Sequence, residues 1–428
     1  MRLTKLAAIA VFSWIVAVPA AHGQFPQYTN PGSGALVQPE VKPTLEKAMG
    51  DALWRFGDVR LQPILGLRNI GYVSNISGKP GEKVDDYTAT GVVGIKAYLP
   101  IGKKVIFAAH ALPEYAWWKT TTTLRTWQYR YGAGLFGYFN RLTVEAKFTA
   151  DDQQSYLSNE LESPANITND KGEINATVRV SGPFSVFFGG SQGQAKYQDN
   201  GLRAFFPASV DLLNRTETVV RGGVLYKREN GFAVGLGYER DNTDFTRSTR
   251  DRSNSGGGPM LTVQHSGSRW NASIDASYRT LSEKTGASFR EFKALSGSGN
   301  IGLKTGGRTQ VNIYGSKGLF YTLAAGTDYA DEQRLGISGQ MLIGWRTDLR
   351  VYYESGQAKY RSAVDALDSQ RTDDFDTLGL EAQFKLGESA TFRLGYNETQ
   401  FNSNLSQFDR KLRNIQVSLN FGGVATAW

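Results

Sequence analysis

Hydrophobic and polar residues alternate one by one along most of the chain after residue 58. The stretch from Thr377 to Tyr396 shows this most cleanly: an apolar row, interrupted by the Gly387-Glu388-Ser389 turn, is made by Leu378, Leu380, Ala382, Phe384, Leu386, Phe392, Leu394 and Tyr396. A period of two indicates β-strands with one apolar face and one wet face. A soluble β-sandwich would show the same alternation, so the pattern alone leaves the class of protein open.

The same alternation, followed along the chain, predicts about eighteen strands, with about sixteen as the alternative count. The expected strands run over 59–73, 88–99, 104–117, 124–138, 142–155, 173–181, 184–196, 215–227, 231–243, 259–266, 269–281, 291–304, 308–318, 333–344, 347–360, 375–386, 390–400 and 408–421.

The links between these strands alternate between short and long. Short links such as Phe139-Asn140 and Gly182-Pro183 alternate with longer polar ones such as Tyr197–Asn214 and Arg361–Asp374. This rhythm is typical of an up-and-down barrel with tight turns at one rim and long loops at the other. Because unpaired backbone groups are costly in lipid, the sheet should close on itself. We therefore expect an all-β protein, a transmembrane antiparallel β-barrel, whose strand ending at Phe421 pairs with the strand at Val59–Tyr72.

The first residues predict export and a small N-terminal element. Residues 1–23 combine basic Arg2 and Lys5 with an apolar run and the small-x-small site Ala21-His22-Gly23, which indicates a cleaved signal peptide; a membrane anchor is the alternative. Residues 24–57 form an N-terminal segment with a short helix expected over Pro43–Phe56, either periplasmic or plugging the barrel. Residues 58–428 form the barrel.

Composition narrows the chemistry. The chain of 428 residues carries a net charge of +8, a mean hydropathy of −0.36 and no cysteine, which excludes disulfides, thiolate metal sites and a lipoprotein anchor. After signal removal only His110 and His265 remain, and they do not suggest a Ser-His pair or a metal-ligand spacing. We therefore expect neither an enzyme nor a cofactor or metal site, and no nucleic-acid partner.

The polar face of each strand should line the lumen. The expected basic lining is Arg60, Arg68, Lys96, Arg130, Lys147, Arg179, Arg221, Lys227, Arg279, Arg334, Arg350, Lys385 and Arg393, and the expected acids are Glu145, Asp151, Glu239, Asp275, Glu354 and Glu381. Bases exceed acids about two to one, and low-dielectric walls focus such a field on anions. The alternative is that these side chains pair across strands and only fill the barrel.

The run Val59–Asn75 resembles the opening strand of the β-barrel porin type 2 family, which comprises outer-membrane barrels of exopolysaccharide operons. The matching residues are Pro63, Leu67, Gly71, Tyr72, Ser74 and Asn75, whereas Val73 stands where an acidic residue is common. The resemblance implies a pore in the outer membrane of a Gram-negative bacterium that exports exopolysaccharide or a similar anionic polymer with a periplasmic polysaccharide-export protein. Other expected partners are outer-membrane lipid, lipopolysaccharide and the barrel-assembly machinery.

Two further functions stay open. A passive, anion-preferring diffusion porin for small solutes would need only the basic interior. An outer-membrane hydrolase would need a nucleophile with a base, which the two histidines make difficult to assemble.

Overall fold

The structure is a computed structural model, and it describes residues 41–76, 84–156, 164–198, 210–228, 231–246, 251–323, 326–363, 370–387 and 390–422. The predicted signal peptide at residues 1–23 lies outside the described residues. No helix within these ranges is long and apolar enough to cross a membrane.

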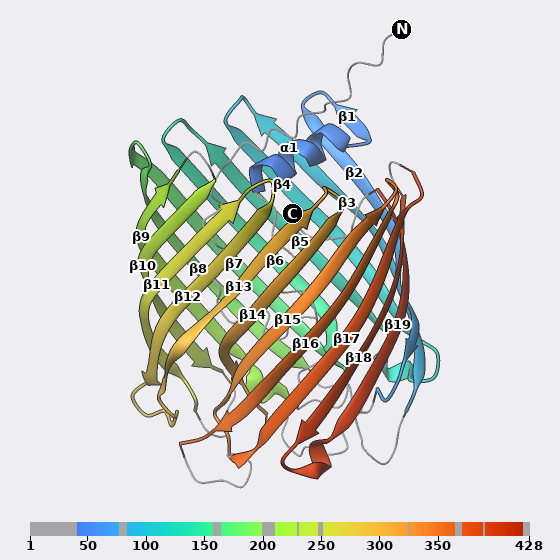
Figure 1. The fold of residues 1–428 in the computed structure, drawn as a ribbon, viewed down its shortest axis with the longest axis vertical. Coiled ribbons are helices and arrows are strands. Elements are labelled where there is room, and N and C mark those ends of the chain that lie inside the picture. The colour runs from blue at the N-terminus through green and yellow to red at the C-terminus, as the bar shows by residue number, and fades with distance from the viewer. Residues whose placement is uncertain are drawn as a thin grey trace.

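The chain forms a closed antiparallel β-barrel, as the alternation predicted (Figure 1). The 19-stranded sheet consists of a ring, β2 to β19, and one short additional strand, β1, paired to β2. The ring therefore contains the predicted eighteen strands. The elements are α1 (Val41–Asp51), β1 (Trp54–Phe56), β2 (Val59–Val73), β3 (Asp86–Ile101), β4 (Val105–Trp118), β5 (Thr126–Tyr138), β6 (Leu142–Tyr156), β7 (Pro164–Ser181), β8 (Phe184–Gln198), β9 (Arg215–Lys227), β10 (Phe232–Phe245), β11 (Asn254–Ser266), β12 (Trp270–Glu283), β13 (Phe292–Thr305), β14 (Thr309–Tyr321), β15 (Tyr329–Ile343), β16 (Thr347–Arg361), β17 (Thr372–Lys385), β18 (Ala390–Ser403) and β19 (Arg410–Phe421), with short 3₁₀ turns η2 (Thr122–Leu124), η3 (Val210–Leu213) and η5 (Ser406–Phe408).

The ring closes where β19 pairs with β2, as predicted, from Phe421↔Leu65 to Ile415↔Tyr72. Here β2 contains a bulge between Arg68 and Gly71. A Cβ on Gly71 would lie 1.7 Å from the Ile415 carbonyl oxygen, so only glycine allows the two backbones to approach this closely. The opening-strand motif thus includes a glycine required at the seam of the barrel.

The loop rhythm is also confirmed. Tight turns join each odd-numbered strand from β3 onward to the even-numbered strand that follows it. These turns lie at the end of the barrel that carries α1. In bacterial outer-membrane barrels the short turns face the periplasm and the long loops face outward. We refer to these two ends as the short-turn rim and the long-loop rim.

Several predicted boundaries are wrong, and two of them differ most in consequence. The helix expected over Pro43–Phe56 spans Val41–Asp51, because Gly57, at a φ of 59°, forms a two-residue turn that folds Trp54–Phe56 back onto β2 as strand β1. Strand β7 begins at Pro164 rather than at residue 173. The outward residues in the added part of the strand, such as Asn166 and Thr168, are polar, so the sequence shows no apolar row there that would predict a strand.

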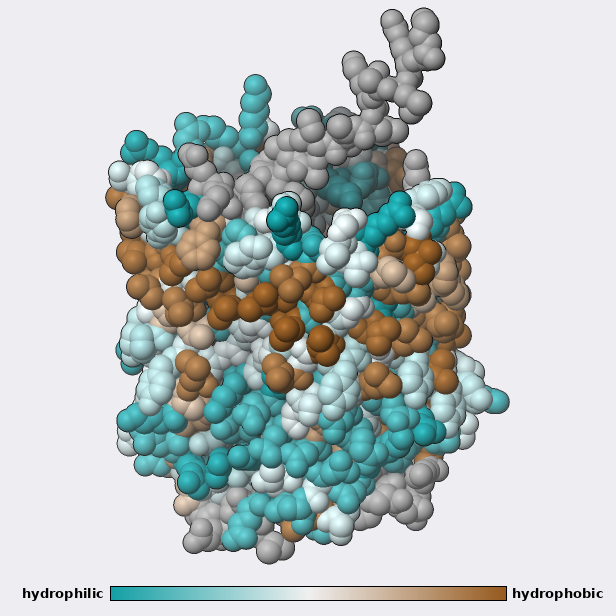
Figure 2. Space-filling view, viewed as in Figure 1, coloured by the Kyte–Doolittle hydropathy of each residue, from teal (hydrophilic) through white to brown (hydrophobic). Residues whose placement is uncertain are grey.

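An apolar belt crosses the face of the barrel shown in Figure 2. It lies close to the short-turn rim, and below it a broad hydrophilic band covers the parts of the strands that reach toward the long-loop rim. Leu335, Val93 and Leu378 are 65%, 62% and 52% exposed, which in water would be unfavourable but in lipid is not. Many aromatic side chains near the strand ends, such as Trp127, Trp270 and Trp345, are exposed on the outer face, but Trp118 is buried and donates to Gln154 (3.0 Å), and Tyr138 faces the interior.

Aromatic rings on the inner wall lie over glycines of the neighbouring strands. A Cβ on Gly379 would lie 2.0 Å from the Tyr352 ring, and a Cβ on Gly336 would lie 2.3 Å from the Tyr314 ring. Both tyrosines are 3% exposed. These inward aromatics are therefore packed into the wall, and the inward glycines make room for them.

Candidate functional site

The barrel interior is the candidate site, because charged side chains gather there. Along its strand, each predicted basic residue alternates with the exposed apolar residues, so its side chain belongs to the inner face of the barrel. In β9, for example, Arg221 is 2% exposed while its neighbour Val220 is 42% exposed. The predicted residues lie in three groups with acids and a fourth set near the short-turn rim.

The first group, which we call the cationic cluster, consists of Arg68 and Arg130, which share the carboxylate of Glu114, and of the neighbouring cross-strand pair Lys96 and His110. These residues come from the inner faces of adjacent strands β2 to β5. Both guanidinium groups donate to Glu114: Arg130 through Nε at 3.2 Å and Nη2 at 2.5 Å, and Arg68 through Nη2.

The cationic cluster carries more positive than negative charge. The Glu114 side chain is 1% exposed, whereas the side chains of Arg68 and Arg130 remain 25% and 16% exposed. Lys96 is paired across the strands with His110, and opposite His110 stands Gly132, which contributes no side chain. One buried carboxylate is therefore shared by two arginines beside a lysine, and the partly exposed arginines face the lumen. This arrangement suits an incoming anion.

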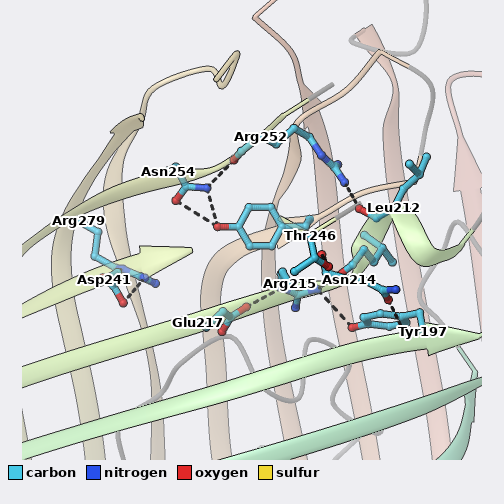
Figure 3. A network of polar contacts seen from close by, with 12 residues as sticks. Tyr197, Leu212, Asn214, Arg215, Glu217, Asp241, Thr246, Arg252, Asn254 and Arg279 are labelled. Atoms are coloured by element: carbon cyan, nitrogen blue, oxygen red, sulfur yellow. Dashed lines mark hydrogen bonds and ion pairs between the residues drawn. The ribbon is translucent and has the colours of Figure 1, made fainter. Parts of the chain in front are cut away.

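The second group extends over β6 to β12 and is closer to neutral. Lys147 lies 3.0 Å from Glu173, which Lys171 also approaches at 3.2 Å. Further along, Arg279 pairs with Asp241 at 2.8 Å (Figure 3). Arg221 donates to the amide oxygen of Asn175 at 3.1 Å.

The third group joins β15, β16 and β17. Arg334 donates to Glu354 at 2.9 Å and to Glu332, and Arg350 lies 3.5 Å from Glu381. In this group three acids accompany two bases. Among these three groups, the excess of positive charge is greatest on the β2–β5 wall.

The remaining predicted residues lie toward the short-turn rim: Arg60, Arg179, Lys227, Lys385 and Arg393. Arg60 donates to the backbone oxygens of Gly57 and Val59, and Arg393 donates to Gln383 at 2.9 Å.

The predicted two-to-one excess of bases is too large. The acids missing from the expected lining are Glu114, Glu173, Glu217, Asp241 and Glu332, each on an inward register and bonded to a basic side chain. Strand parity could have identified them, because Glu217 and Arg221 lie four residues apart on the same face of β9. Cross-strand pairing, the alternative stated at the outset, applies to much of the lining.

Helix α1 occupies the short-turn mouth of the barrel. Leu45, 1% exposed, packs with the inward residues Tyr98, Ile106 and Phe136 of β3, β4 and β5. Lys42 places its ammonium 5.2 Å from the ring centre of Tyr138. The helix is therefore attached to the inner wall and lies across the opening (Figure 1).

At the long-loop mouth several loops are tied together by a set of contacts that we call the loop latch, made by Arg252, Asp328 and Arg290. Arg252 donates to the backbone oxygens of Leu212 (2.9 Å) and Thr322 (2.6 Å), and thereby joins three loops (Figure 3). The Asp328 carboxylate accepts hydrogen bonds from the backbone N–H groups of Arg290 (2.9 Å) and Ala363 (2.8 Å), which connects two further loops to these three.

An apolar cluster lies beside the loop latch. It includes Tyr197, Leu213, Leu281, Phe292 and Tyr321, all almost fully buried. The long-loop end therefore has a folded interior of its own, which the strand pattern did not predict.

The two histidines cannot share one site. His110 faces inward and is 4% exposed, whereas His265 stacks on the outward Trp270 with ring centres 3.7 Å apart. Within the described ranges no group of His, Asp and Glu residues is arranged to hold a metal ion.

No protein family and no curated protein matches the sequence. Solved structures are similar in fold. OccK2 (OpdF) of Pseudomonas aeruginosa, solved in complex with glucuronate, has a TM-score of 0.51 at 12% identity, over 84% of this chain and 98% of its own. OccAB3 of Acinetobacter baumannii has a TM-score of 0.48 at 11% identity, over 84% of this chain and 99% of its own. A BenF-like porin of Pseudomonas fluorescens Pf-5 has a TM-score of 0.49 at 12% identity, over 85% and 98%.

The last of these three proteins is named a porin. At this identity they inform on architecture alone. The closed ring of eighteen strands, the apolar belt and the similarity to OccK2 agree with one another. The chain has the fold of an outer-membrane porin.

Proposed function

We propose that the protein is a passive diffusion porin of the Gram-negative outer membrane that prefers small anionic solutes. The observation that carries the proposal is the cationic cluster, in which Arg68 and Arg130 share the buried carboxylate of Glu114 and Lys96 lies further along the same wall, opposite His110. Low-dielectric walls strengthen such a field and raise the local concentration of anions.

Small carboxylates fit this cluster better than inorganic anions do. A guanidinium group offers a planar fork of N–H donors that matches the two oxygens of a carboxylate. Arg68 and Arg130 share Glu114 in this way, so a solute carboxylate can take the same donors in exchange. OccK2, solved with the sugar acid glucuronate, supports this solute class.

The packing of the interior favours small solutes over a polymer. Charged side chains on the inner wall, including Arg221, Arg279 and Glu354, are less than 10% exposed, so they pack against one another. Helix α1 lies at one mouth, and the loop latch ties loops together at the other. A polysaccharide chain would need all three to move aside, whereas a small solute needs local rearrangements only.

Uptake into proteoliposomes tests the proposal. We expect glucuronate to enter faster than glucose, and the ratio of the two rates to fall in Arg130→Gln. The matched control Arg240→Gln removes an exposed arginine on the outer face of β10 and should keep the ratio of the wild type. Equal or slower entry of glucuronate through the wild-type protein would contradict the proposal.

Polysaccharide export is the second candidate, and it is supported by the resemblance of Val59–Asn75 to barrels of exopolysaccharide operons. It would add a periplasmic export protein as a partner, besides lipopolysaccharide and the assembly machinery that any such barrel uses. Deletion of the gene should then abolish surface polysaccharide, and an unchanged surface would eliminate this candidate.

A further inference from the structure

A ring of basic residues follows the short-turn rim. Six of the tight turns each present an exposed lysine or arginine. We call these residues the basic collar: Lys103, Arg141, Arg228, Arg269, Arg308 and Arg346.

Acidic residues do not balance the collar. Within the described part of these six turns there is no Asp or Glu, and the sequence adds one acid, Glu229, beside Arg228. Of the described acids near this rim, Asp51 and Asp58 belong to the N-terminal segment, and Asp348, two residues after Arg346, accepts a hydrogen bond from Gln340. Among the described residues no ion pair involves a collar side chain, and each of the six side chains is exposed to solvent.

The collar lies just beyond the edge of the apolar belt. Arg269 and Arg346 are direct neighbours of the outward Trp270 and Trp345, which are 40% and 67% exposed, and Arg141 follows Phe139, 43% exposed. Exposed tryptophans mark the boundary between hydrocarbon and headgroups. The collar cations lie in the tight turns within one or two residues of these aromatics, which places them near the level of the lipid phosphates. The Arg346 guanidinium already stacks on Trp345, 3.8 Å from its ring centre.

The collar charges are also spread around the barrel. They occur from the β3–β4 turn to the β15–β16 turn, with about 10 Å between successive tight turns, since each pair of strands is about that wide. A docked protein would favour a patch on one side. A ring of lipids contacts the whole circumference.

We propose that the basic collar binds the anionic headgroups of phospholipids in the periplasmic leaflet. This inference rests on the orientation of the barrel in the membrane and not on what passes through the pore. Each lysine or arginine near an anionic surface strengthens association about fivefold at low salt. The collar would thus surround the protein with anionic lipid and hold the short-turn rim at the membrane surface.

The test compares two variants of equal charge. The collar variant carries Lys103→Gln, Arg141→Gln, Arg269→Gln and Arg308→Gln. The control variant carries Lys196→Gln, Arg240→Gln, Lys293→Gln and Lys359→Gln, which removes exposed bases from the outer faces of strands near the long-loop rim. Each purified protein is exposed to mixed micelles of phosphatidylglycerol and phosphatidylethanolamine, and the retained lipids are counted by native mass spectrometry.

We expect the wild type and the control variant to retain more phosphatidylglycerol than phosphatidylethanolamine. In the collar variant the ratio of the two retained lipids should fall at least about tenfold. An unchanged ratio in the collar variant would overturn the proposal. The proposal would also be overturned if the collar variant kept the wild-type lipid ratio but lost a bound acidic periplasmic protein. A changed conductance with a wild-type lipid ratio would overturn it too.

Two measurements protect the test against a misfolded variant. The charge-preserving variant Arg141→Lys, Arg269→Lys, Arg308→Lys should keep the preference of the wild type. For the wild type itself, the preference should decline as salt is raised from about 0.05 M to about 0.5 M, because screening shortens the reach of surface charges. A preference independent of salt would contradict an electrostatic collar.

Discussion

Replacing Arg252 tests whether the loop latch ties the loops at the long-loop mouth together. Its guanidinium donates to Thr322 O at 2.6 Å, to Leu212 O at 2.9 Å and to Asp328 O at 3.3 Å, and it lies 4.7 Å from the ring centre of Phe245. Arg252→Met keeps much of the side-chain volume but removes every donor.

The magnitude follows from these contacts. Hydrogen bonds from a charged donor each contribute about 1.5–3 kcal/mol. Two of the three are short, and water at the mouth can satisfy part of the freed carbonyls, so we expect a loss of about 3 kcal/mol. Local opening should then become about a hundredfold more frequent, since about 1.4 kcal/mol corresponds to a factor of ten.

Hydrogen exchange measures this opening directly. Amides of residues 210–214 and 322–328 should exchange about a hundredfold faster in Arg252→Met, while amides of β2 to β5 keep their rates. Arg240→Met, on the exposed outer face, should leave both regions unchanged. Equal exchange in residues 210–214 of the wild type and Arg252→Met would refute the idea that this arginine ties the loops together.

Three further substitutions test other parts of the structure. Glu114→Gln leaves two arginines without their buried carboxylate; it should lower the free energy of unfolding by about 3 kcal/mol in denaturant titrations and raise the preference for anions. Gly379→Val would collide with the ring of Tyr352 and should cost about 1–3 kcal/mol, whereas Gly339→Ala, with no atom within 4 Å of its new Cβ, should cost far less. Leu45→Asp buries a charge against aromatic rings, so α1 should detach and single-channel conductance should increase; unchanged conductance would mean that the helix does not narrow the mouth.

The architecture could be read from the sequence wherever lipid acts on one face of the sheet. Leu378 and Leu380 are exposed and Thr377 is buried, as their alternation predicted, because hydrocarbon outside and polar groups inside impose opposite demands on successive residues. Beyond the membrane this constraint disappears. The first half of β7 is polar on its outer face, and its residues therefore read as part of a loop.

The charged interior was only half predictable. Parity placed Arg68 and Arg130 on the inward face, but the acid that joins them, Glu114, lies between Pro113 and Tyr115 in a strand that reads as largely apolar. The loop latch could not be foreseen at all. It depends on contacts such as Arg252 with Thr322, 70 residues apart, which no local pattern encodes.

The central claim is that water and small anions pass through the middle of this barrel, past the cationic cluster. The most direct test is the reversal potential of the wild-type protein in a planar bilayer separating two concentrations of potassium chloride. We expect open channels whose reversal potential has the same sign as the equilibrium potential of chloride. A membrane that stays silent, or a reversal at the polarity set by potassium, would contradict the claim.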